Sequence, residues 1–168
     1  MKVAQRLVWA AVLIWAIWTG GQVYHAMMVV PIWSVDPATS IPRYTQLSRD
    51  AATQPFFMWF STLWPALLTG IAIILTRKLP IAARSSLALF AAGAFLISGV
   101  LILWMVPAIW GVIREAAPSS EAVQTFRIWE SANRVRLVAE LVLLPVAIRG
   151  LIGMYSPCGV SKQQSGAG

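Results

Sequence analysis

Cysteine and histidine are almost absent from this chain, which contains one of each in 168 residues. The single cysteine, Cys158, lies in a Gly/Ser/Gln-rich tail, so the sequence excludes an internal disulfide and a cysteine metal cluster. The single histidine, His25, excludes a haem held by two histidines of one chain and leaves only histidine–methionine ligation. No cofactor is firmly implied, and a metal or haem at His25 stays as an alternative.

Charged residues are also scarce. Only 11% of the residues are charged and six are acidic, whereas 58% are hydrophobic and the mean hydropathy is +0.71. These values lie outside the range of soluble domains and predict an integral membrane protein. The chain also lacks a glycine-rich phosphate loop, a nucleophile elbow and a His-Glu-x-x-His sequence, which removes three common catalytic classes.

Four apolar segments are near or above the ~20 residues that a helix needs to cross the hydrocarbon core. Only helices satisfy their own backbone hydrogen bonds in lipid at this hydrophobicity. We therefore expect an all-α integral membrane protein, a four-transmembrane-helix bundle over residues 1–155, with a flexible cytoplasmic tail at 156–168. The predicted helices cover about 7–32, 55–76, 85–113 and 122–153, with an outer loop at 33–54.

The basic residues are distributed unevenly about these helices. With a cytoplasmic N-terminus, seven basic residues and no acidic residue fall on the inner side, as the positive-inside rule prefers. This distribution predicts both termini in the cytoplasm of a bacterial-type inner membrane, and it accounts for the net charge of +7 without a nucleic-acid partner. The inner basic residues are Lys2, Arg6, Arg77, Lys78, Arg84, Arg149 and Lys162.

The last predicted helix carries polar side chains into an otherwise apolar segment. Four of them recur at the spacing of one helix face, within about 60° of each other. Intramembrane charges commonly mark a functional site, although the same charges could instead fasten the helix to the bundle. Glu130 and Arg134 lie on a neighbouring face, where we expect a flanking structural ion pair. The stripe consists of Trp129, Asn133, Arg136 and Glu140.

The first predicted helix carries a second stripe with the same spacing, formed by Trp18, Gln22, His25 and Val29. His25 lies near the outer end of this helix, at a depth comparable to that of the other stripe. A titratable histidine inside a membrane favours a proton-transfer group or a metal ligand, and a histidine hydrogen-bonded for helix packing is the alternative.

Facing stripes would form a tryptophan-walled pocket in the outer half of the bundle. Such a pocket suits an oxygen-bearing aromatic or quinone-like molecule that arrives from the lipid. Arg136 and Asn133 would hold a phenolate or enolate oxygen, Glu140 would orient Arg136, and His25 would exchange the proton. For the tryptophans, an interfacial aromatic belt with ordinary core packing is the alternative. The predicted catalytic residues are His25, Arg136 and Glu140, and the predicted binding residues are Trp18, Gln22, Trp59, Trp104, Trp129 and Asn133.

Short motifs in the two stripes resemble a family of small four-helix membrane proteins that includes the anthrone oxygenases of aromatic polyketide pathways. The motifs are Trp129-x3-Asn133-x2-Arg136 in the last helix, and Gly20-Gly21-x3-His25 followed by Pro31-x-Trp33 in the first. Asn133 stands where members close to the anthrone oxygenases tend to have a histidine. The resemblance implies the four-helix architecture and the pairing of the first helix with the last.

Two functions from different classes follow from these observations. The first is a membrane enzyme or binder of a hydrophobic aromatic or quinone-like molecule, with an oxygenase-like oxidoreductase reaction that needs no organic cofactor as one form. The alternative is a non-catalytic accessory or assembly subunit, with a membrane-protein partner or a second copy docked on the outer loop. The residues leave open whether the protein is an enzyme.

Overall fold

The computed structural model describes residues 2–40, 42–43, 62–76, 79–108 and 119–155. Within these ranges the chain is helical and contains no strand. Two single turns of π-helix, η1 and η2, interrupt the longer helices. The elements are α1 (Lys2–Tyr24), η1 (His25–Val29), α2 (Val30–Val35), α5 (Leu63–Leu75), α6 (Ile81–Val100), η2 (Leu101–Met105) and α8 (Ser120–Gly153).

The helix boundaries follow from local capping chemistry. The side chain of Ser119 accepts a hydrogen bond from the Ala122 amide and starts α8 two residues before the predicted boundary. Pro80, in an extended conformation, precedes α6, which therefore begins at Ile81 rather than at the predicted residue 85. Residues 55–61 and 109–113 of two predicted helices lie outside the described residues.

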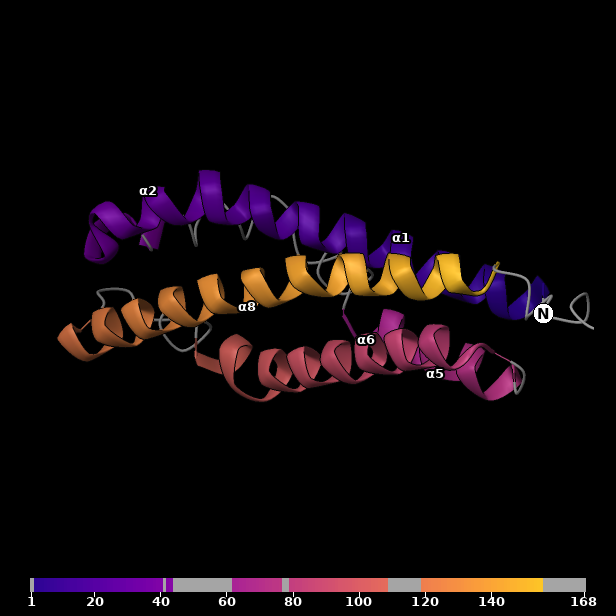
Figure 1. Cartoon of the computed structure of the whole chain (residues 1–168). Helices are drawn as coiled ribbons and strands as arrows, with labels where there is room; N and C mark the ends of the chain where they lie inside the picture. Colours follow the sequence, from indigo (N-terminus) through magenta and orange to yellow (C-terminus); the bar gives the residue numbers. More distant parts are fainter. Residues whose placement is uncertain (1, 41, 44–61, 77–78, 109–118, 156–168) are drawn as a thin grey trace, which may run out of the picture.

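The four longer helices run side by side (Figure 1). α1 contacts α5 and α8, and α6 contacts the same two helices, so each of the four packs against two others. The start of α1 lies beside the end of α8, where the Gln5 side chain donates to the Met154 carbonyl oxygen. We call this the terminal end of the molecule.

Glycines bring α6 and α8 into close contact. A Cβ atom on Gly150 would lie 2.7 Å from a methyl carbon of Leu87, and one on Gly153 would lie 2.7 Å from Cβ of Ala83. A Cβ on Gly93 would lie 2.8 Å from Leu143. Small residues at these positions let two apolar helices approach more closely than larger side chains would allow.

Two separate groups of buried apolar side chains form the core. The large core cluster fills the molecule toward the terminal end, and the small core cluster lies toward the opposite end, where both π-helical turns reach α8. The small core cluster consists of Val30, Met105, Ala122, Phe126 and Trp129. The large core cluster consists of Ala4, Val8, Ala11, Val12, Trp15, Ala66, Ala72, Leu87, Phe90, Ala94, Ile97, Ala147, Leu151 and Met154.

The outer surface of the helices is rich in large apolar side chains. The helical runs Lys2–Ile32 and Ile81–Ala108 are each long and apolar enough to cross a membrane, and Leu63–Leu75 is a shorter apolar helix. α8 is also long, but its charged residues make it less apolar than these two helical runs. Exposed apolar residues include Leu13, Ile17, Met27, Ile71, Ile74, Leu89, Phe95, Leu96, Leu103, Val135, Val138, Val142 and Ile152.

We expect Gly150→Ala to lower the free energy of unfolding by about 1–3 kcal/mol, because the new methyl group overlaps the buried Leu87 side chain. Thermal unfolding of the purified protein in detergent measures this change. Gly99→Ala is the matched control, since a Cβ there has nothing within 4 Å and alanine favours a helix. Equal destabilisation by both variants would contradict close packing of α6 on α8.

Candidate functional site

A layer of buried polar side chains lies between the two core clusters. α1 contributes Trp18 and Gln22, and α8 contributes Asn133, Arg136 and Glu140. All five are at most 8% exposed. Their i, i+3, i+4 and i+7 spacing places each set on one helix face, and the contact between α1 and α8 brings the two faces together. These residues of the two predicted stripes therefore meet.

Arg136 is the centre of this layer. Its Nη2 donates hydrogen bonds to Oε1 of Gln22 and, at 2.7 Å, to Oδ1 of Asn133. Its Nη1 lies 3.5 Å from Oε1 of Glu140, one helical turn away. The guanidinium carbon lies 5.9 Å from the ring centroid of Trp18, within the range of a cation–π contact. The guanidinium thus contacts both helices at once.

Glu140 is held in place by two tryptophans of α1. Nε1 of Trp18 donates to Oε1 of Glu140 at 2.9 Å, and Nε1 of Trp15 donates to its backbone carbonyl oxygen at 3.0 Å. The carboxylate is fully buried. Trp15 is not among the predicted site residues, and its ring also packs edge-on against Phe90 at 5.2 Å. Its position one turn before Trp18 was the signal that could have revealed it.

Three buried polar atoms in and beside the layer have no hydrogen-bond partner within the described structure. They are Nε of Arg136, Oε2 of Glu140 and Oγ1 of Thr19. Buried donors and acceptors are normally paired, and an unpaired one costs roughly 1–3 kcal/mol. The Glu140 carboxylate can therefore accept one more hydrogen bond, and the Arg136 guanidinium can donate one more.

His25 borders the layer on the side of the small core cluster. It begins η1, one turn after Gln22, and its ring lies edge-on to Trp129 with centroids 6.5 Å apart. Trp129 in turn stacks on Phe126 at 5.8 Å. His25 is partly buried and lies one helical turn after Gln22, the α1 residue that accepts a hydrogen bond from Arg136.

The π-helical turn corrects one residue of the predicted stripe. In an uninterrupted α-helix Val29 would share the face of Trp18, Gln22 and His25. η1 adds one residue to that turn, and Val30, only 4% exposed, packs in the small core cluster with Val29 partly buried beside it. Single π-helical turns of this kind are frequent at functional sites.

The predicted flanking pair is present and has a third member. Nη2 of Arg134 lies 2.6 Å from Oε1 of Glu130, and Nη1 of Arg127 lies 3.6 Å from the other carboxylate oxygen. Arg127 also donates to the backbone carbonyl oxygen of Ser34, which joins α8 to α2. The Arg134 side chain is 73% exposed and that of Glu130 only 8%, so the arginine lies at the surface and covers a buried carboxylate.

One predicted wall residue, Trp104, stands apart from this layer. Trp104 lies on η2 and is 44% exposed, which places its ring at the surface of the molecule. Trp59 lies outside the described residues. Thr62, the residue before α5, and Ser98 of α6 form a buried pair of hydroxyls, with Oγ1 and Oγ 2.6 Å apart.

In the described ranges, no three His, Cys, Asp or Glu side chains gather as a metal site requires. A metal or haem at His25 therefore stays a prediction. Comparisons with family models, with curated proteins and with solved structures found no match for the chain.

We expect Arg136→Met to destabilise the protein by about 3–5 kcal/mol, because it leaves the buried carboxylate of Glu140 without its cationic partner. Arg134→Met is the matched control and should cost less than about 1 kcal/mol, because the Arg134 side chain is exposed and Glu130 keeps Arg127 as a cationic partner. Unfolding in denaturant measures both. The double variant Arg136→Met/Glu140→Gln should recover part of the loss, and failure to do so would contradict the coupling.

Proposed function

We propose that this protein is an integral membrane four-helix bundle that binds a hydrophobic, oxygen-bearing aromatic molecule at the Arg136 layer. The observation that supports membrane insertion is an inverted distribution of polarity. Arg136, Glu140, Gln22 and Asn133 are buried, whereas large apolar side chains cover the outside of all four helices. A folded chain in water normally exposes its charges and avoids extended apolar patches, so this surface suits lipid.

Helix length supports a specific depth for the layer. At 1.5 Å per residue, the 34 residues of α8 extend roughly 50 Å, more than the ~30 Å hydrocarbon core. With Arg149 at the inner boundary, the outer boundary falls near Trp129. Arg136 then lies roughly 10 Å below the outer surface, and the first turns of α8 project beyond the hydrocarbon. Lys2 and Arg6 fall on the inner side, as the positive-inside rule prefers.

The single native cysteine tests this orientation. If the tail is cytoplasmic, Cys158 should react with a membrane-impermeant maleimide in inverted membrane vesicles and be protected in intact spheroplasts. A Cys158→Ser/Ser120→Cys variant, which moves the thiol to the exposed start of α8, should show the reverse pattern. Labelling of both thiols from the same side, or release of the chain by alkaline carbonate, would contradict a membrane-spanning bundle.

The ligand class follows from the unpaired atoms and their surroundings. Nε of Arg136 is a buried cationic donor without a partner, so a ligand oxygen that accepts a hydrogen bond would satisfy it. Trp18 and Trp129 offer aromatic surface on either side of the Gln22 and Asn133 amides. A quinone carbonyl or a phenolate on an aromatic ring has this combination of properties, and such molecules dissolve in lipid.

Each side chain then has a physical task. Arg136 would stabilise negative charge on the ligand oxygen, and Glu140, fixed by Trp18, would keep the guanidinium oriented. His25, one turn outward from Gln22, is placed to exchange a proton with the bound molecule. Binding is the core of the proposal, and an oxygenase-like reaction of the kind seen in the anthrone oxygenases is one use of it.

One observation favours a second candidate, a non-catalytic accessory subunit. The Gln22, Asn133 and Glu140 side chains already engage Arg136 and join α1 to α8, which is what a helix fastener would do. Under this alternative the protein would copurify with a stoichiometric partner, and deletion of residues 36–50 would release it. The two candidates therefore predict different binding partners for the purified protein, an aromatic small molecule in one case and a protein subunit in the other.

Menadione, a small lipid-soluble quinone, tests the ligand class. We expect it to quench the tryptophan fluorescence of the purified protein saturably, because Trp18 and Trp129 border the layer. Arg136→Lys keeps the charge but loses the planar donor edge, and it should weaken binding by about ten- to a hundredfold. Arg134→Lys is the matched control and should bind normally.

Circular dichroism and thermal unfolding of each variant separate lost binding from lost folding. His25→Ala is the second variant for the menadione titration. It removes a side chain that borders the layer and leaves Arg136, the charge partner of Glu140, in place. Unsaturable quenching, or equal binding by folded Arg136→Lys and wild-type protein, would reject the quinone-like ligand.

A further inference from the structure

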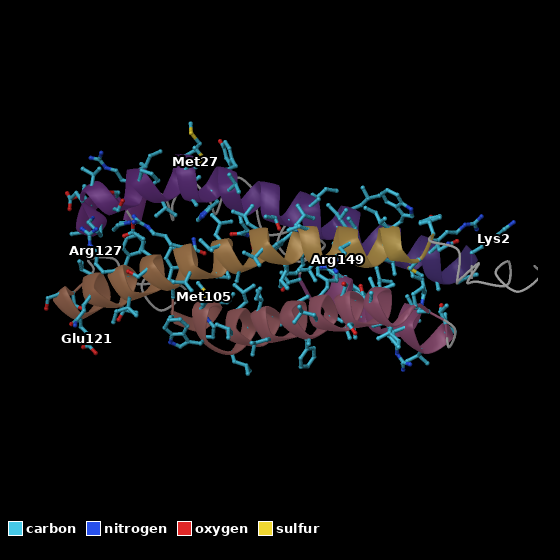
Figure 2. The ribbon with its side chains drawn as sticks, viewed as in Figure 1. Lys2, Met27, Met105, Glu121, Arg127 and Arg149 are labelled. Atoms are coloured by element: carbon cyan, nitrogen blue, oxygen red, sulfur yellow. The ribbon has the colours of Figure 1, made fainter. Side chains whose placement is uncertain are left out.

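The terminal end of the molecule carries a basic and aromatic helix face outside the layer described above. Lys2, Arg6 and Trp9 stand at positions i, i+4 and i+7 of α1, so they share one face of that helix. All three side chains are exposed. Lys2 points outward at this end of the molecule (Figure 2). We call this set the terminal basic face.

Hydrogen bonds fix this face against the end of α8. Nε1 of Trp9 donates to the hydroxyl of Tyr155 at 3.0 Å, and the Gln5 side chain donates to the carbonyl oxygen of Met154 at 3.4 Å. Because the Tyr155 oxygen accepts from the indole, its own proton is directed elsewhere and can be donated. The aromatic pair is about half exposed, at 47% for Trp9 and 56% for Tyr155.

The charge at the terminal end is uncompensated in the part of the chain that the structure describes. The ion pairs of that part all lie on α8 and involve Glu130 or Glu140, which are far along the helix from Tyr155. α1, α5 and α6 contain no acidic residue. Lys2 and Arg6 therefore present positive charge on the same helix face as Trp9, whose indole is hydrogen-bonded to the Tyr155 hydroxyl.

We propose that the terminal basic face, together with Tyr155, binds the phosphate of an anionic phospholipid in the adjacent leaflet. A headgroup phosphate accepts charge-assisted hydrogen bonds from lysine and arginine, and a tyrosine hydroxyl adds a neutral donor. Tryptophan and tyrosine rings are stable at headgroup depth, where one edge is apolar and the other hydrated. The acyl chains would lie along the exposed apolar residues of α1, beginning with Leu13.

This inference rests on the proposed membrane placement but not on the ligand of the Arg136 layer. Its test uses the full-length protein in a neutral detergent, with phosphatidylglycerol and phosphatidylcholine of identical acyl chains. Native mass spectrometry gives the apparent Kd of each lipid, and thermal unfolding gives the stabilisation. We expect phosphatidylglycerol to bind more tightly than phosphatidylcholine.

A charge-matched pair of double variants separates a defined site from general surface charge. Lys2→Gln/Arg6→Gln should raise the apparent Kd for phosphatidylglycerol about 25-fold, since each basic residue near a headgroup contributes roughly a fivefold effect. Arg84→Gln/Arg149→Gln removes the same charge from exposed positions on α6 and α8, and it should change the Kd less than about threefold. Tyr155→Phe should weaken binding by about threefold to tenfold.

Three results would overturn the proposal. They are equal weakening by the two double variants, equal affinity for the two lipids, and stabilisation by glycerol 3-phosphate as large as that by phosphatidylglycerol. The last would show that phosphate alone, without a lipid, is recognised. Menadione binding should stay normal in Lys2→Gln/Arg6→Gln, so loss of the quinone site and loss of the lipid site are measured independently.

Discussion

The guanidinium of Arg136 is the group on which the packing of α1 against α8 depends. An arginine is expensive to bury because it loses its hydration, and the cost is offset only when acceptors surround it. Here the acceptors come from both helices, with Gln22 on α1 and Asn133 and Glu140 on α8. These contacts therefore determine which helix α1 packs against and also the register in which the two helices pack.

The rest of the core is arranged around this requirement. The large core cluster and the small core cluster flank the layer on both sides, and apolar surroundings strengthen each charge-assisted hydrogen bond within it. The same surroundings make every unpaired atom costly. For this reason Nε of Arg136 and Oε2 of Glu140 mark the positions where an additional polar group would bring the largest gain.

Much of this arrangement could be predicted from residue spacing. The period of 3.6 residues placed Trp18 and Gln22 on one face and Asn133, Arg136 and Glu140 on another, and both faces are buried where the helices meet. Spacing within a helix depends only on nearby residues, so it can be predicted from the sequence. The ion pair between Glu130 and Arg134 could be predicted for the same reason.

Features that depend on packing between distant segments could not be predicted in this way. The hydrogen bond of Trp15 to the Glu140 backbone depends on how closely α1 packs against α8, and the exposure of Trp104 depends on which side of η2 meets its neighbours. The Thr62–Ser98 pair joins residues of unremarkable type. The π-helical turn has no composition signal, although it decides which valine enters the core.

That turn has a consequence for how this helix tolerates change. Because η1 holds one residue more than an α-helical turn, α1 and α2 keep the relative orientation that they would have in a continuous α-helix with one residue fewer. Loss of one residue between positions 25 and 29 would restore an ordinary α-helical turn and leave α2 on nearly the same face, whereas the same loss within α1 would rotate everything beyond it by about 100°. Val30 would stay in the core in the first case, so the chain tolerates loss of a residue at this turn that it would not tolerate one or two turns earlier.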